Sequence, residues 1–239
     1  MYYNDSFFYA NSIYILLLIP VLILTFYAQA QVKGNFRKYS QVVSRRHMMG
    51  AEAAQAVLRA NGVFNVTVTS TPGELTDHYD PRTNTIRLSE SVYNAPTIAA
   101  VGVAAHEAGH AVQYATNYGA IRLRQAIIPI TQFSSKFAML AIMLGLVLYW
   151  NSLFAIGIIL FSVLTLFQLI TLPVEFDASR RAMAAIEGGM LAEDEARGAK
   201  KVLKAAALTY VAALLSSAVQ LLRFVLIFMS RTGNTRRRR

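Results

Sequence analysis

Ala105-His106-Glu107-Ala108-Gly109-His110 is the stretch on which the interpretation of this chain depends. Its flanks, residues 98–104 and 111–114, are apolar and mostly small, which predicts a helix packed closely on its neighbours. Residues four positions apart lie on one face of an α-helix, so His106 and His110 are expected to point imidazole nitrogens at one metal ion. Burying both histidines in so apolar a helix without a partner would be costly. The pattern therefore favours a metal site over two core histidines beside a chance glutamate.

Two further residues of this stretch, Glu107 and Gly109, indicate how the site would work and how closely it is packed. Glu107 lies about 100° round the helix from His106, beside the ion and not on it. Zinc lowers the pKa of a bound water to about 7, so a carboxylate in that place can act as general base at neutral pH. The H-E-x-x-H spacing is that of helical zinc peptidases, and it predicts Glu107 as the catalytic residue. Gly109 costs a helix about 1 kcal/mol relative to Ala. We therefore expect the ion or another segment to approach closely there.

The composition indicates a membrane protein. Hydrophobic residues make up 55% of the 239 residues and charged residues only 15%. The chain has no Cys, so it forms no disulfides. The formal net charge of +10 is concentrated beside long apolar runs, which is typical of membrane topology. Nucleic-acid binding would rest on the arginine-rich tail alone, and we do not expect it.

The apolar runs divide the chain into six segments and predict a mainly α membrane protein. We expect about four transmembrane helices and a small α+β, zincin-like catalytic region. The segments are an N-terminal transmembrane anchor (1–30), a cytosolic α+β region with the histidine helix (31–126), a transmembrane helical hairpin (127–174), a juxtamembrane region (175–204), a C-terminal apolar helix (205–230) and a basic tail (231–239). No Lys or Arg precedes the first run, and no small-residue cleavage site follows it. This pattern favours an uncleaved anchor over a signal peptide.

Local signals predict the elements outside the spans. The expected elements are a helix at 50–60 closed by Asn61-Gly62, a strand at 66–69, a hairpin of 73–80 and 85–89 around a turn at 81–84, the histidine helix opened by Ala95-Pro96, the end of the third span at Pro173, a turn at Gly188-Gly189 and a helix from Glu193.

The positive charges predict the orientation of the spans. Of the 23 Lys and Arg, 16 lie in residues 31–126 and 175–204. The positive-inside rule puts these regions in the cytoplasm and the N-terminus outside. Four spans would also put Arg231 and the tail outside, against the rule. Arg223, inside the last apolar run, costs a few kcal/mol if it faces lipid. It either faces the bundle or water, or it marks an interfacial segment; we favour a segment that crosses.

Two histidines leave a zinc site incomplete, because catalytic sites take three protein ligands and keep one position for water. Glu175 follows a span that returns to the side of the histidine helix, and Glu is the partner in His₂Glu sites. Asp177 is the rival third ligand. The alternative is that both acids merely pair with Arg180 and Arg181, which is worth about 0–1 kcal/mol if exposed.

Several stretches together resemble a known family. They are residues 73–80 (GELTDHYD), 87–90 (RLSE), 105–113 (AHEAGHAVQ) and 172–179 (LPVEFDAS). These stretches resemble the bacterial YugP-like neutral zinc metallopeptidases over nearly the whole chain. More distantly, the chain is similar to HtpX-type and CAAX prenyl membrane proteases.

The resemblance implies roles for particular residues. It implies His106, His110 and Glu175 as zinc ligands and Glu107 as catalytic base. Ser179 stands where the distant relatives have an Asp. Asp177 is then a candidate to orient a ligand histidine in its place.

These inferences predict a multi-pass protein of the bacterial cell membrane that binds one Zn²⁺ per chain. We expect a zinc-dependent endopeptidase that acts on peptides or membrane proteins at the cytoplasmic face of the lipid bilayer. His78 has two interpretations, an oxyanion stabiliser and a surface strand residue. The alternative function is a catalytically inactive membrane scaffold with a structural zinc site. A transporter is disfavoured because the spans lack a run of acidic residues.

Overall fold

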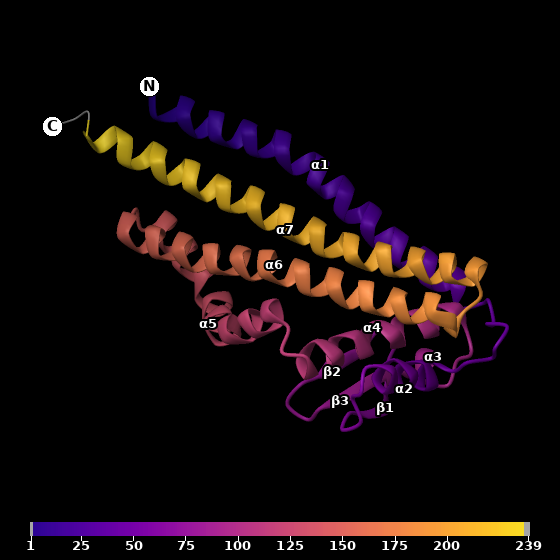
Figure 1. The fold of residues 1–239 in the computed structure, drawn as a ribbon. Helices are drawn as coiled ribbons and strands as arrows, with labels where there is room; N and C mark the ends of the chain where they lie inside the picture. Colours follow the sequence, from indigo (N-terminus) through magenta and orange to yellow (C-terminus); the bar gives the residue numbers. More distant parts are fainter. Residues whose placement is uncertain (1, 237–239) are drawn as a thin grey trace. The chain divides into compact units, whose positions relative to one another are not determined.

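Long apolar helices make up most of the chain, which the computed structural model describes for residues 2–236, with side chains for residues 12–232. Within this part, four helices are long and apolar enough to cross a membrane (Figure 1). They are α1 (Tyr2–Tyr39), α5 (Gly119–Val147), α6 (Asn151–Ala185) and α7 (Glu193–Arg236). The other elements are α2 (Gly50–Ala60), β1 (Thr67–Thr71), β2 (His78–Asp80), β3 (Thr85–Ser89), α3 (Glu90–Tyr93), α4 (Ile98–Ala115) and a π-helical turn (Ile186–Met190). This confirms the predicted fold class. Residues 237–239 of the predicted basic tail lie outside the described residues.

The chain forms two compact units, each built from separated stretches of sequence. The first unit contains Met1–Phe26, Leu123–Ile170 and Tyr210–Arg239. The second contains Tyr27–Arg122 and Thr171–Thr209. The histidine helix and Glu175 both belong to the second unit.

In the first unit, polar side chains of the apolar helices face one another. The Tyr14 hydroxyl donates to Gln220 Oε1 at 2.9 Å. The Arg223 guanidinium lies 4.4 Å from the centroid of the Tyr14 ring. Thr165 Oγ1 and Ser217 Oγ are 2.6 Å apart and join α6 to α7. Polar groups inside apolar helices are costly when they face lipid. Arg223 is therefore turned toward α1, in agreement with the interpretation that it faces the bundle.

In the same unit, the Arg231 side chain donates hydrogen bonds to backbone carbonyls at the C-terminal end of α5. Its guanidinium nitrogens lie 3.4 Å from Gly145 O and 3.2 Å from Leu146 O. The same group stacks 5.1 Å from the Tyr149 ring centroid and 5.7 Å from that of Phe154. A helix leaves its last carbonyls without intrahelical donors, and a cation there is favourable. Arg231 is thus held by the α5–α6 hairpin.

In the second unit, a small sheet packs beside α2 and α4. The strand order is β1-β3-β2, with β1 parallel and β2 antiparallel to β3. The β2–β3 hairpin and the bounds of α2 agree with the prediction from sequence. The parallel pairing of β1 with β3 was not predicted. Among the described residues β2 pairs with β3 alone, so it is an edge strand of the sheet.

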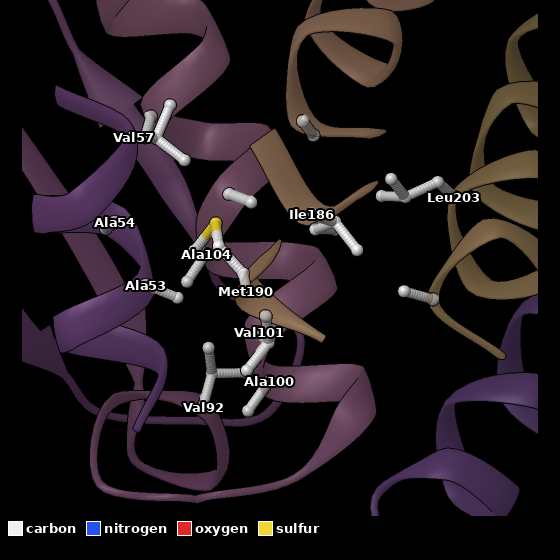
Figure 2. Packing of buried hydrophobic residues seen from close by; sticks show 14 of the residues in the cluster. Ala53, Ala54, Val57, Val92, Ala100, Val101, Ala104, Ile186, Met190 and Leu203 are labelled. Atoms are coloured by element: carbon white, nitrogen blue, oxygen red, sulfur yellow. The ribbon is translucent and has the colours of Figure 1, made fainter. Parts of the chain in front are cut away.

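The core of the second unit is built largely from small side chains (Figure 2). Ala53 and Ala54 of α2 are fully buried, as is Ala104 of α4. Figure 2 shows Ile186 and Met190 beside these helices, with Leu203 coming from α7. Small residues allow backbones to approach closely, which confirms the tight packing predicted for the histidine helix.

Two predicted boundaries were wrong. The histidine helix begins at Ile98, because Thr97 is its N-cap and accepts a hydrogen bond from Ala100 N at 3.3 Å; Pro96 precedes the helix. Helix α6 continues through Pro173 to Ala185 and does not end at the proline. The break comes at the predicted turn, where Gly189 has a φ of 116°. The third span and the segment that carries Glu175 are therefore one helix.

Candidate metal centre

Helix α4 places two imidazoles on one face. His106 and His110 are one helical turn apart, with ring centroids 4.8 Å apart and ring planes at 83°. The rings flank a common point and do not stack on each other. The helix around them is mostly buried, whereas the His106 and His110 side chains are 14% and 12% exposed.

Helix α6 brings a carboxylate to this point. Glu175 Oε2 lies 3.4 Å from His106 Nε2 and 3.5 Å from His110 Nε2, and the residue is only 2% exposed. One potential ligand atom from each of the three residues lies within 4.8 Å of those from the other two. The two histidines and Glu175 therefore converge, although His110 and Glu175 are 65 positions apart in sequence.

Gly109 explains how α6 comes so near. A Cβ on Gly109 would lie 2.7 Å from Ala178 O and 3.3 Å from Ala178 Cα, closer than a side chain tolerates. The backbones of α4 and α6 are thus in contact one turn from Glu175. This confirms the expectation of a close approach at Gly109, and the approaching segment is the one that carries the carboxylate.

The outer nitrogens of both rings have partners of their own. Ser179 Oγ lies 3.2 Å from His106 Nδ1, and Gln113 Oε1 lies 3.1 Å from His110 Nδ1. These contacts turn both Nε2 atoms toward Glu175. Metal-bound histidines almost always use their second nitrogen in this way.

The donor set fits a zinc ion. Ligands at about 2.0–2.2 Å from a tetrahedral ion lie about 3.3–3.6 Å from one another. The two Nε2–Oε2 distances, 3.4 and 3.5 Å, fall in this range. Two imidazoles and one carboxylate are also the His₂Glu set of catalytic zinc sites. His106, His110 and Glu175 are therefore the residues that would hold the ion.

Asp177 is separated from His110 by the side chain of Gln113. It is 4% exposed and accepts hydrogen bonds from Arg180, from Arg181 Nε at 2.6 Å and from Gln113 Nε2 at 2.9 Å. It reaches His110 through Gln113. The structure does not place Asp177 among the three converging ligand atoms; it places Ser179 directly on His106.

Charge at the site favours a cation. Burial alone would lower the pKa of His110, but the hydrogen bond to Glu175, with the negative charges of Glu107 and Glu175, outweighs it and raises that pKa. Glu107 also acts on Asp77 in the connection before β2. Burial raises the pKa of Asp77, the Ser89 hydrogen bonds oppose the shift, and the charge of Glu107 adds to it. Glu107 is therefore within electrostatic range of both His110 and the loop before β2.

The His78 side chain does not point toward His106, His110 and Glu175. It is exposed, and its Nδ1 lies 2.8 Å from Thr76 O. The next residue, Tyr79, packs on Tyr114 of α4 with ring centroids 5.3 Å apart. Successive strand residues point to opposite faces, so His78 points away from α4. This geometry favours the surface interpretation.

Gln113 is the residue at the site to which sequence reasoning gave no role. It is fully buried and contacts His110, Asp177 and Val174 O. A sequence signal existed. An amide three residues after the second histidine, next to Ala111 and Val112, is a buried polar group that requires partners.

Comparison with known proteins agrees with this geometry. A family model described as "Putative neutral zinc metallopeptidase" matches residues 14–229. A protein of Bacillus subtilis (strain 168) named "Putative membrane protease YugP" is 49% identical over 219 residues, which cover 91% of this chain and 97% of that protein. No solved structure matches the chain. A match over nearly the full length, around a His₂Glu donor set on apolar helices, means that this chain belongs to the neutral zinc metallopeptidase family.

Proposed function

We propose that the chain is a membrane-embedded zinc endopeptidase that hydrolyses peptide bonds at the cytoplasmic membrane face. The observation that carries this proposal is the convergence of His106, His110 and Glu175, with Glu107 next to the first ligand on the same helix. Among the described residues the group has three members. Catalytic zinc sites have three protein ligands, whereas structural sites have four. This supports catalysis over a scaffold with a structural zinc.

The chain's own residues divide the work. Zinc, when bound, supplies a Lewis acid that polarises a carbonyl and acidifies a water molecule. His106 and His110 would hold the ion through Nε2, and Glu175 would hold it through a carboxylate oxygen. The Glu107 carboxylate takes a proton from the attacking water and later delivers one to the nitrogen of the leaving amine. Only Glu107 among these residues gains and loses a proton during the reaction.

The edge of β2 that does not pair with β3 is our candidate for substrate binding. This strand lies next to α4 through the Tyr79–Tyr114 contact, and its partner β3 occupies only one edge. An extended peptide can add to such an edge through main-chain hydrogen bonds. A peptide bound there would lie beside the helix that carries His106 and Glu107. Both soluble peptides and loops of membrane proteins can adopt the required extended form.

The cytoplasmic orientation is supported by charge. The segments at 31–126 and 175–204 carry 16 of the 23 Lys and Arg, and they include all the site residues. Arg231 is the charge nearest the last span that opposes this orientation. Its contacts with the α5 carbonyls give it a structural reason to be there.

Replacement of Glu107 by Gln tests the proposal. We expect Glu107→Gln to bind zinc as the wild type does and to lose proteolysis by about 10²–10⁴-fold, because a general base typically contributes that much. Zinc content is measured on the purified chain, and cleavage by comparing membrane proteomes of cells that express each form. Glu187→Gln, an exposed glutamate in the same unit, is the matched control. Full turnover by Glu107→Gln would contradict the mechanism. A wild type that binds zinc and cleaves nothing would favour the scaffold.

A further inference from the structure

Gln113 is held at every polar atom of its side chain. It lies three residues after His110 on α4 and is 0% exposed. Its Nε2 donates to Val174 O at 2.8 Å and to Asp177 Oδ2 at 2.9 Å, and its Oε1 faces His110 Nδ1 at 3.1 Å. Burying an amide costs free energy unless such bonds are formed. The complete set of partners fixes the amide in one position.

The partners also fix which end of the amide faces His110. A backbone carbonyl and a carboxylate accept hydrogen bonds and cannot donate them. Both Nε2 hydrogens must therefore point at Val174 O and Asp177. The opposite orientation would place Oε1 against two acceptors. With Oε1 toward the ring, His110 Nδ1 must carry the proton, and the Nε2 lone pair is left facing Glu175.

Asp177 holds the Gln113 amide in this orientation by accepting a hydrogen bond from its Nε2. Arg180 and Arg181 both donate to its carboxylate, with Arg181 Nε at 2.6 Å. Arg181 is itself placed over the Tyr118 ring, 5.9 Å from its centroid. The two cations offset the charge of the buried Asp177, which then serves as acceptor for Gln113.

We infer that Gln113 is a positioning residue that locks His110 in the Nδ1–H form, with Asp177 holding the Gln113 amide; this inference rests on the proposed zinc site. His106 is held differently. Its partner Ser179 is a hydroxyl, which can donate or accept and so does not select a tautomer. The lock therefore acts on one ligand histidine. Losing it should weaken zinc binding more than losing the Ser179 contact does.

Zinc affinity measured by chelator competition on the purified full-length chain tests this inference. Gln113→Met keeps the length and volume of the side chain and removes its hydrogen bonds. We expect about 10–100-fold weaker zinc binding, the usual loss when a partner of a metal ligand is removed. Ser179→Ala is the matched control, with a smaller loss expected. Equal zinc affinity of Gln113→Met and wild type would overturn the inference and leave the proposed enzyme intact.

A charge exchange separates the lock from packing. Gln113→Glu alone sets two carboxylates against each other, and we expect weakened zinc binding. Adding Asp177→Asn should restore part of the affinity, because the new amide can donate to the new carboxylate, which still accepts from His110. Thermal unfolding of the same variants is measured beside zinc affinity, because a merely structural role predicts that affinity recovers only as far as stability does. Absence of any rescue of zinc affinity would overturn the lock.

Nitrogen NMR of the zinc-free wild type gives a readout that needs no variant to fold and that the metal does not impose. The proton of the neutral His110 ring is expected on Nδ1, and a neutral ring protonated on Nε2 would overturn the inference. Failure of the wild type to bind zinc would overturn both the lock and the proposed function. This outcome differs from an unchanged affinity in Gln113→Met, which refutes the lock alone.

Discussion

The Asp77 carboxylate accepts hydrogen bonds that hold its loop, although burial disfavours its negative charge. It accepts from Ser89 N at 2.7 Å and from Ser89 Oγ at 3.1 Å. Burial nevertheless raises its pKa, helped by the negative charge of Glu107. The loop before β2 is thus fastened to the end of β3 by a carboxylate whose charge is disfavoured by burial.

Two substitutions separate these effects. Asp77→Asn keeps an acceptor and removes the charge, so we expect a thermal unfolding midpoint at pH 7 equal to or above that of the wild type. Asp77→Ala leaves Ser89 N without its acceptor and should lower stability by about 1–3 kcal/mol. Thermal unfolding of the purified chain measures both changes.

The pH dependence follows from the sign of the shift. A raised pKa contributes stability that is present below the ordinary Asp range and is lost as the pH rises through the folded pKa. Any advantage of Asp77→Asn should therefore shrink as the pH falls. An Asp77→Asn chain less stable than wild type at pH 7, with the gap constant as the pH falls, would contradict this account.

At the same scale, local spacing was sufficient to place His106 and His110 on one helix face, where the structure brings them together. The catalytic role of Glu107 stays a prediction. The convergence of Glu175 agrees with its choice from the known types of zinc site. The role of Gln113 was not predicted, because its partners Val174 and Asp177 come from a helix about sixty residues further along the chain. Spacing within one helix identifies groups on one face, but it does not reveal which distant atoms meet them.

At the scale of elements, α4 contacts two other helices through glycines. Gly109 meets the backbone of Ala178 on α6, where a Cβ would lie 2.7 Å from the carbonyl oxygen. Gly102 meets Ala199 on α7, where a Cβ would lie 3.4 Å from the neighbouring Cβ. The first contact leaves no room for a methyl group, whereas the second leaves nearly normal contact distance.

Gly109→Ala should force α4 and α6 apart and draw Glu175 away from the histidines. We expect a loss of about 1–3 kcal/mol of stability, as for overpacked cores, together with weaker zinc binding. Gly102→Ala is the matched control, in which better helix propensity, worth up to about 1 kcal/mol, opposes a mild contact. Thermal unfolding and zinc titration measure both variants. Equal behaviour of the two would show that the close α4–α6 contact does not set the metal site.

Element bounds were predictable where local chemistry decides them. The composition of residues 50–60 and the acidic start at Glu193 marked helices correctly. The prediction that the helix ends at Pro173 was wrong. A proline lacks one hydrogen-bond donor, but it does not have to end a long helix that packs on its neighbours. β1 pairs with β3, which is not the next strand in sequence, and no turn motif in the sequence predicts that pairing.

At the scale of the whole molecule, the absence of Cys makes the orientation easy to test. Phe64 is 80% exposed and Trp150 is 57% exposed, so a single Cys at either position should react readily. We expect Trp150→Cys to react with a membrane-impermeant maleimide in intact cells and Phe64→Cys to react only after lysis. The reverse pattern would place the metal centre outside the cytoplasm and contradict the proposed sidedness.

The four long apolar helices were predictable because hydropathy over about twenty residues is a strong signal. The composition of the two units was not predictable in the same way. Each unit collects stretches that the sequence separates, such as Tyr27–Arg122 with Thr171–Thr209. A pass along the chain detects the segments but not which of them share a core.

The separation of the ligands between α4 and α6 has a consequence during synthesis. When the ribosome has made His106 and His110, the nascent chain still lacks Glu175 and both helices of the hairpin. A two-histidine site holds zinc poorly, so the complete donor set can form only after α6 has been synthesised. We therefore expect a chain that stops before α6 to bind zinc weakly.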